Sequence, residues 1–113
     1  MKSTIKKIIK KLGYTITKID QDEFLPDMDK DFFELAKQCK PYTMTSTERL
    51  YSVYKSVEYL TKNNIDGDYI ECGVWKGGSS MMIALSLLKN NCSHKKIYLY
   101  DTYEGMSEPT EDD

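Results

Sequence analysis

The sequence lacks the features that mark membrane-spanning proteins, secreted proteins, and proteins stabilised by disulfides or zinc. No apolar run approaches the roughly 18 residues that cross a membrane, and the N-terminus lacks the apolar core and small-residue cleavage site of a secretory signal. The three cysteines, Cys39, Cys72 and Cys92, show no CxxC spacing, so neither a disulfide framework nor a zinc site is indicated. We therefore expect a soluble protein of the reducing cytoplasm.

The sequence also has little basic surface outside one segment. Its 113 residues carry a net charge of −2, and six lysines precede the first acid, Asp20. Because these lysines do not alternate with aromatic residues, we do not expect nucleic acid as a target. The only histidine, His94, follows Asn90 and Asn91 in a polar loop and is not assigned to catalysis. A chain of this length makes one domain at most.

Residues 2–12 predict a short amphipathic helix with lysines on one face, closed by Gly13. Such a helix packs on its own domain or on a second subunit, or it lies on a membrane surface. Four apolar residues are few for membrane attachment, so the pattern favours packing, which includes a homo-oligomer. The apolar residues recur at helical spacing: Ile5, Ile8, Ile9 and Leu12.

The middle of the chain predicts two further helices. Residues 14–19 alternate apolar and polar side chains, which suits a short strand or an extended connector. Residues 27–39 have helical periodicity. Thr45 and Glu48 have the spacing of a capping box, so a long helix should start at Thr45 and continue to the turn residues near Asn63.

From residue 68 the pattern changes to strand, turn, helix and strand. Residues 69–74 and 97–100 predict strands, and residues 79–88 between them predict a helix. This helix has little polar surface, so it needs cover on more than one side. Two parallel strands joined by a helix belong to sheets that are covered on both faces. The sequence therefore predicts an α/β fold.

A glycine-rich turn with Gly73, Gly77 and Gly78 joins the first strand to the helix. Backbone N–H groups at a helix start are unpaired, and a turn without side-chain bulk leaves room for a cofactor beside them. The spacing does not fit a P-loop, because Lys76 precedes the glycine pair. A dinucleotide fold requires Gly-x-Gly-x-x-Gly, whereas this turn has Gly73-x-x-x-Gly77-Gly78, so a nicotinamide-binding fragment is an alternative that fits poorly.

S-adenosylmethionine suits the turn better because it carries no phosphate. It needs space beside the turn, a polar group for its amino-acid end and an acid for its ribose, and Glu71, Gly73 and Asp101 supply this set. Asp101 can accept hydrogen bonds from both ribose hydroxyls, and Glu71 can hold the ammonium group directly or through water. Each acid alone also fits a structural role, Asp101 as a turn former and Glu71 as a capping or salt-bridging acid.

Three parts of the sequence carry a specific resemblance. They are Thr43-Met-Thr-Ser46 with Glu48-Arg49, Gly67-Asp68 with Ile70-Glu-Cys-Gly-Val-Trp-Lys-Gly-Gly-Ser-Ser80, and Tyr100-Asp-Thr-Tyr-Glu-Gly-Met-Ser-Glu-Pro109. In these parts the chain resembles the macrocin O-methyltransferase (TylF-type) family of class I S-adenosylmethionine-dependent methyltransferases. The resemblance runs from about residue 41 to the last residue. It implies a Rossmann-like class I fold, a parallel sheet with flanking helices.

The resemblance also implies where the cofactor is bound, and it implies no catalytic residue in this chain. Trp75 and Tyr103 would flank the adenine or close the pocket. The implied cofactor-binding residues are Thr43, Met44, Glu71, Cys72, Gly73, Val74, Trp75, Asp101, Thr102, Tyr103, Glu104 and Gly105.

The family's general base and magnesium-binding carboxylates lie beyond the stretch that matches here. We therefore expect the N-terminal part of a longer enzyme, with residues 1–40 as a helical and extended lead-in and residues 41–113 as the cofactor-binding first half. The implied activity is O-methylation of a hydroxyl on a sugar or glycosylated metabolite, with this part alone inactive. The alternative of another class is an inactive fragment that acts as a docking or regulatory module through its basic N-terminal helix.

Overall fold

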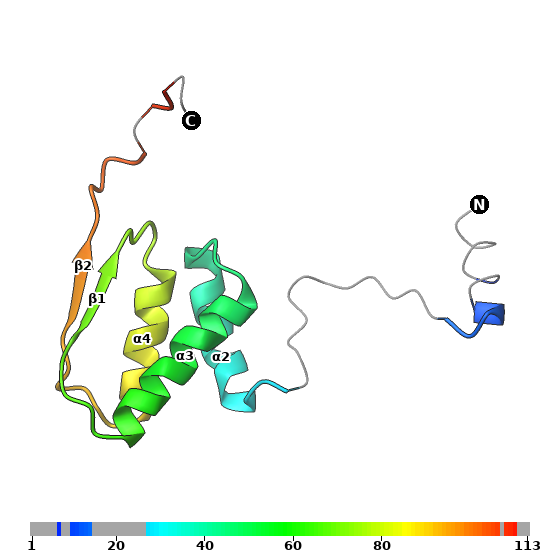
Figure 1. The fold of residues 1–113 in the computed structure, drawn as a ribbon, viewed down its shortest axis with the longest axis horizontal. Helices are drawn as coiled ribbons and strands as arrows, with labels where there is room; N and C mark the ends of the chain where they lie inside the picture. The colour runs from blue at the N-terminus through cyan, green and yellow to red at the C-terminus, as the bar shows by residue number, and fades with distance from the viewer. Residues whose placement is uncertain (1–6, 8–9, 15–26, 107, 111–113) are drawn as a thin grey trace.

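The computed structural model describes residues 7, 10–14, 27–106 and 108–110 (Figure 1). These residues form a small α/β structure in which two strands lie side by side next to a group of helices. In chain order the elements are α2 (Lys30–Cys39), the 3₁₀ turn η1 (Lys40–Tyr42), α3 (Thr47–Lys62), β1 (Tyr69–Cys72), α4 (Gly78–Lys89) and β2 (Ile97–Tyr100).

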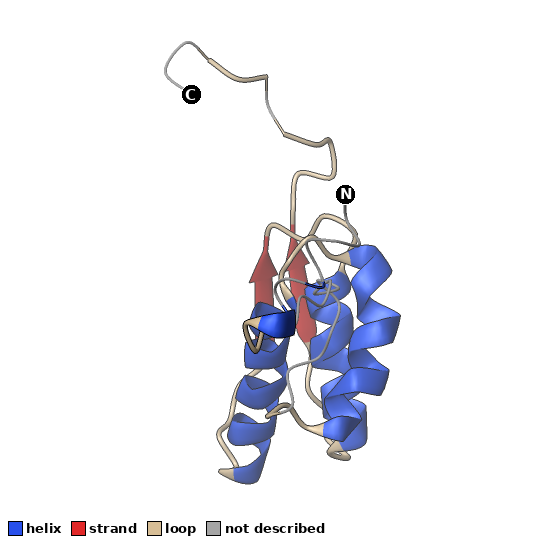
Figure 2. Ribbon diagram, turned by 90° about the vertical axis from the view of Figure 1, so that its right-hand side faces the viewer, coloured by secondary structure: helices blue, strands red, loops and turns tan. Residues whose placement is uncertain are grey.

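The two strands are parallel, and α4 connects them. Tyr69 lies opposite Ile97 at the start of the ladder. Beyond its end, the Gly73 N–H donates to the Tyr100 carbonyl at 2.8 Å. The predicted βαβ unit is confirmed. Both strands point in the same direction (Figure 2), so the loops after β1 and β2 emerge at the same edge of the sheet.

The hydrophobic core lies where the three helices meet. Phe32 of α2, Leu50 and Tyr54 of α3, and Met82 of α4 are all buried. The helices predicted within residues 27–39 and from about Thr45 to Asn63 are therefore confirmed. Helix α4 contacts α2, α3 and β2, as its scarcity of polar residues predicts. Its Leu88 remains 60% exposed, so the described residues do not cover the helix completely.

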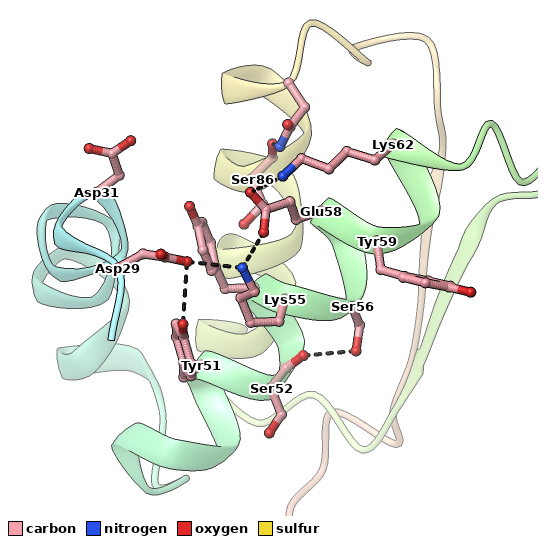
Figure 3. A network of polar contacts seen from close by, with 12 residues as sticks. Asp29, Asp31, Tyr51, Ser52, Lys55, Ser56, Glu58, Tyr59, Lys62 and Ser86 are labelled. Carbon is pink, nitrogen blue, oxygen red and sulfur yellow. Dashed lines mark hydrogen bonds and ion pairs between the residues drawn. The ribbon is translucent and has the colours of Figure 1, made fainter. Parts of the chain in front are cut away.

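Polar contacts join the start of α2 to α3 (Figure 3). Asp29 Oδ2 accepts from the Tyr51 hydroxyl at 3.3 Å and from Lys55 Nζ at 3.0 Å. Lys55 also pairs with Glu58, which accepts from Lys62 Nζ at 3.0 Å. Hydrogen bonds to Glu58 and then to Asp29 raise the pKa of Lys55. Because these ion pairs are solvent-accessible, each contributes at most about 1 kcal/mol to stability.

The described helices cover only one face of the sheet. Successive strand residues point to opposite faces, and Tyr69 and Glu71 on the helix side are partly buried. Ile70, by contrast, is 65% exposed on the other face. The sequence predicts a sheet covered on both faces, and within the described part of the chain helices cover one face only. The exposed residues of the other face are Ile70, Cys72, Tyr98 and Tyr100.

Helix α3 starts one capping residue later than predicted. Its N-cap is Ser46, whose hydroxyl accepts from the Arg49 N–H at 3.4 Å. The Thr45 N–H instead donates to Thr43 Oγ1 at 3.1 Å, so Thr45 belongs to the preceding turn. The capping box predicted between Thr45 and Glu48 is therefore wrong. Thr45 is not the N-cap because it is part of the turn around Thr43, and the periodicity of the sequence does not reveal this turn.

The structure describes only part of the N-terminal segment. Lys7, Lys10 and Lys11 are helical, and Gly13 is left-handed at φ 83° with its N–H 3.2 Å from the Lys10 carbonyl. This agrees with a helix that ends at Gly13. The isoleucines of its predicted apolar face, and the strand predicted at residues 14–19 apart from Tyr14, lie outside the described residues. No helix in the described part of the chain is long and apolar enough to cross a membrane.

Candidate cofactor site

A cleft of about 1010 Å³ opens at the carboxyl ends of β1 and β2. In open α/β sheets, ligands bind in the crevice outside the carboxyl ends of the strands. Three segments form the walls: the turn before α3, the loop after β1 and the loop after β2. The lining residues are Met44, Gly73, Trp75, Tyr100, Asp101, Thr102, Tyr103, Gly105 and Met106.

Asp101 joins the two strand-end loops. Its Oδ2 accepts from the Val74 N–H at 2.6 Å and from the Trp75 N–H at 3.1 Å, both in the loop after β1. Its Oδ1 accepts from the Tyr103 N–H at 2.9 Å in its own loop. The N–H groups of Tyr103, Val74 and Trp75, in that order, lower the pKa of Asp101 to about 2. The carboxylate therefore stays ionised and bound to backbone at neutral pH.

Two aromatic residues of the cleft have unusual backbone conformations. Trp75 has φ 50° and Tyr103 has φ 57°, which is the left-handed region that bulky residues rarely adopt. The Lys76 ammonium lies 4.7 Å from the centre of the Trp75 ring, and the Tyr103 hydroxyl donates to the Leu99 carbonyl at 3.4 Å. Such strained positions cluster at binding sites, where surrounding contacts hold them.

The glycines of the turn have different roles from one another. A Cβ on Gly73 would meet nothing within 4 Å, so Gly73 leaves open space in the cleft, as predicted. A Cβ on Gly78 would lie 2.5 Å from Thr43 Cβ and 2.7 Å from the Tyr42 carbonyl. The space at Gly78 is filled by this neighbouring backbone, so its predicted role of leaving room for a cofactor is wrong. Gly78 lets the turn before α3 approach the start of α4.

Glu71 faces the first turn of α4. It accepts a hydrogen bond from the hydroxyl of Ser80, which is buried. Gly77 is the N-cap of α4, and no side chain caps the helix start, so a capping role for Ser79 or Ser80 is not seen. One carboxylate oxygen of Glu71 is thus bound within the protein. Glu71 lies outside the residues that line the cleft.

The structure brings together seven of the twelve predicted cofactor residues: Met44, Gly73, Trp75, Asp101, Thr102, Tyr103 and Gly105 line the cleft. The others lie beside it. Val74 is buried and donates its N–H to Asp101, Thr43 supports the turn before α3, Cys72 is exposed on a strand and Glu104 is exposed in a loop.

Two lining residues, Tyr100 and Met106, were not predicted. Tyr100 precedes Asp101 and Met106 follows Gly105, so their position next to predicted residues is the sequence feature that could have identified them.

No three His, Cys, Asp or Glu side chains in the described part of the chain lie close enough together to hold a metal ion. The resemblance places the magnesium-binding carboxylates of the family beyond this stretch of sequence. Among the cysteines, Cys39 is buried in the core, and its burial raises the pKa of the thiol to about 11. It stays neutral and is unsuited to metal binding or nucleophilic chemistry.

Comparison with known proteins identifies relatives of the same kind. A 4'-O-methyltransferase of Streptomyces olivaceus, named for 8-demethyl-8-(2,3-dimethoxy-alpha-L-rhamnosyl)-tetracenomycin-C, is 30% identical over 74% of this chain and 32% of its own length. Demethyldecarbamoylnovobiocin O-methyltransferase of Streptomyces niveus is 30% identical over 63% of this chain and 27% of its own. Mycinamicin III 3''-O-methyltransferase of Micromonospora griseorubida is 28% identical over 64% and 28%.

The matched region spans about a third of each relative's length or less. No solved structure matches the chain. The model of the family Macrocin-O-methyltransferase (TylF) matches residues 5–113, which extends the likeness well before residue 41. With nearly the whole sequence matched by this model, the chain belongs to the macrocin O-methyltransferase family.

Proposed function

We propose that this chain forms the cofactor-binding half of an S-adenosylmethionine-dependent O-methyltransferase and that residues 41–113 hold the cofactor in the cleft. The observation that carries the proposal is the position of the cleft. It opens at the carboxyl ends of two parallel strands, and most of its lining consists of residues that the sequence assigns to the cofactor. Membership of the family, whose activity depends on S-adenosylmethionine, supports the same cofactor.

The lining residues suit the parts of this cofactor. Trp75 and Tyr103 offer exposed aromatic surface for the adenine. Gly73 leaves space for the amino-acid end. Glu71, which precedes Gly73 by two residues in β1, has one carboxylate oxygen held by Ser80. Asp101 faces the cleft as the acid for the ribose. When bound, the cofactor would supply an electrophilic methyl group on its sulfonium, which passes in line to an acceptor hydroxyl oxygen as the thioether leaves and the hydroxyl proton is lost.

Two observations weigh against a nicotinamide dinucleotide. A pyrophosphate needs free backbone N–H groups in the turn after the first strand. Here the N–H groups of Val74 and Trp75 are both bonded to Asp101. The position where a second glycine would let a phosphate approach, two residues after Gly73, carries the bulky Trp75 side chain.

The acceptor class that we propose is a hydroxyl on a sugar-bearing small molecule. All three relatives are named as O-methyltransferases, and one name includes a rhamnosyl group. The cofactor's sulfonium needs only an oriented hydroxyl whose proton can leave.

Isothermal titration of the 113-residue chain with S-adenosylhomocysteine tests the proposal. We expect saturable binding that weakens about tenfold in Trp75→Ala, because stacking on an aromatic wall contributes on the order of 1 kcal/mol. Tyr59→Ala is the matched control, since Tyr59 is another exposed aromatic residue, on α3, and does not line the cleft. NAD is titrated in parallel. Binding of NAD in preference to S-adenosylhomocysteine, or no binding by a chain that circular dichroism shows to be folded, would contradict the proposal.

A further inference from the structure

The carboxylate of Asp101 is largely occupied before any ligand binds. An ionised carboxylate has about four acceptor positions. At least three of them are filled by the N–H groups of Val74, Trp75 and Tyr103. At most one position therefore remains for a ligand, whereas the sequence predicts that Asp101 accepts from two ribose hydroxyls.

Two of the three donors belong to the strained aromatic residues of the cleft. Trp75 and Tyr103 are both left-handed, and both line the cleft. A bulky residue holds this conformation only where surrounding contacts compensate for it. The backbone N–H groups of both residues donate such stabilising hydrogen bonds to Asp101, Trp75 to Oδ2 and Tyr103 to Oδ1 of the same carboxylate.

The remaining contacts of the two aromatic residues are weaker. Tyr103 has a long hydrogen bond of 3.4 Å from its hydroxyl to the Leu99 carbonyl. Trp75 has the Lys76 ammonium over its ring, and its side chain is half exposed. Neither contact joins the loop after β1 to the loop after β2. Asp101 does, because its partners Val74 and Trp75 precede it by 27 and 26 residues.

We infer that Asp101 is a positioning residue, which fixes Trp75 and Tyr103 as the two aromatic walls of the cleft and accepts from at most one hydroxyl of the ligand. The inference deepens the proposed function, since the walls would receive the adenine of S-adenosylmethionine. Removal of the Asp101 carboxylate would free the loop after β1 and the loop after β2 from one another. Ligand binding would then weaken because Trp75 and Tyr103 are no longer held in place.

The test compares Asp101→Asn with Asp68→Asn. Asn keeps the shape of the side chain, but its NH₂ group cannot accept. Asp68 is the matched control because its Oδ1 also accepts a backbone N–H across the sheet, from Lys96 at 2.9 Å, at the opposite end of the strands. Three quantities are measured: amide hydrogen exchange at Val74, Trp75 and Tyr103, acrylamide quenching of Trp75, which is the only tryptophan, and the affinity for S-adenosylhomocysteine.

We expect Asp101→Asn to speed exchange at one or more of the three amides by about tenfold or more, to increase quenching and to weaken binding about tenfold, as the loss of a charged acceptor implies. Exchange in α3 and α4 should not change, and Asp68→Asn should leave all three quantities as they are. Weaker binding with unchanged exchange and quenching would overturn the inference, since Asp101 would then act as a ligand contact alone. No change in any quantity would overturn it as well.

A second measurement uses the unaltered chain and serves if Asp101→Asn does not fold. S-adenosylhomocysteine is compared with its 2′-deoxy and 3′-deoxy analogues. An affinity loss for at most one analogue supports the inference, and a loss of about tenfold for both overturns it. If the unaltered chain binds none of them, the proposed function fails. Exchange and quenching then still decide whether Asp101 holds the walls.

Discussion

The two ends of the sheet are built on the same plan but with different residues. At the amino ends of the strands, Asp68 accepts the Lys96 N–H and so joins the entry to β1 with the entry to β2. At the carboxyl ends, Asp101 accepts from the loop after β1. At each end, therefore, an aspartate side chain links the segment next to β1 with the segment next to β2 through hydrogen bonds. Only the carboxyl end opens into the large cleft.

The ends differ in which residues take left-handed conformations. On the amino side they are Asn64, Gly67 and Asn91, residue types that accept this conformation readily. On the carboxyl side Gly73, Gly77 and Gly105 also have positive φ, but there Trp75 and Tyr103 take it as well, at a cost of about 1–2 kcal/mol each. Strain that a fold does not need for its own turns points to a use of those side chains. This difference supports the proposal that the cofactor binds at the carboxyl end.

The largest expected change in stability is at the carboxyl end, at Gly78. Gly78→Ala places a Cβ against Thr43 and the Tyr42 backbone, so we expect the free energy of unfolding to fall by about 1–3 kcal/mol, as for overpacked cores. Helix propensity alone would give a gain of up to about 1 kcal/mol, so the sign itself is diagnostic. Urea unfolding followed by circular dichroism measures it.

Gly77→Ala is the control for Gly78→Ala. Its Cβ would meet only Val74 Cγ1 at 4.0 Å, so it reports the cost of φ 83° without a collision. A Gly78→Ala chain as stable as the unaltered chain would show that the turn before α3 does not need its close approach to α4.

Relief of strain gives the next largest effect. Trp75→Gly removes the unfavourable left-handed backbone, so we expect the free energy of unfolding to rise by about 0.5–1 kcal/mol after the greater freedom of the unfolded glycine chain is deducted. Binding of S-adenosylhomocysteine should fall about tenfold with the lost wall.

Asn64→Gly at the amino side is the counterpart, and we expect a change within about 0.5 kcal/mol because asparagine already tolerates this conformation. Equal gains at Trp75 and Asn64 would mean that the two ends do not differ in strain. Urea unfolding of both variants makes the comparison.

Protonation of Asp101 at low pH should loosen the two loops at the carboxyl end of the sheet. Its pKa in the folded chain, about 2, lies below the value of about 3.9 for an unperturbed carboxyl. The contribution of the carboxylate is therefore fully present above about pH 4 and is lost as the pH falls through about 2. We expect acrylamide quenching of Trp75 to increase over this range. Asp101→Asn should lack the transition, and an identical titration in that variant would assign it to other groups.

The smallest effect concerns the thiols. Cys72 at the carboxyl end is exposed, Cys92 before β2 is partly buried, and Cys39 is buried with its pKa raised to about 11. A disulfide reagent such as DTNB should therefore modify Cys72 first and Cys39 only on unfolding. Saturation with S-adenosylhomocysteine should not protect Cys72, because it does not line the cleft. Protection would place the ligand elsewhere on the sheet.

The βαβ unit and the place of the cleft were predictable because they depend on local patterns. Apolar runs of four to six residues, a glycine turn and an apolar helix specify parallel strands with little ambiguity. The carboxyl ends of such strands must lie together, so residues near Gly73 and Asp101 had to meet.

The partners within the site were not predictable, because they depend on register and close packing. Asp101 reaches Val74 across 27 residues, and no spacing in the sequence shows that backbone amides will occupy its carboxylate. The need for glycine at position 78 comes from Tyr42 and Thr43, a turn that precedes it by a whole helix and strand. Ser46 likewise replaced Thr45 as the cap because of a turn that periodicity does not show.

The central position of α4 also affects how the chain folds as it leaves the ribosome. Helices α2 and α3 are made first, yet they contact one another less than either contacts α4. Their shared core remains open on the side of Met82 until α4 emerges. Apolar side chains such as Phe32 are then exposed for the several seconds that synthesis of about 50 further residues, up to Met82, takes. During that interval the nascent chain presents the surface that chaperones bind.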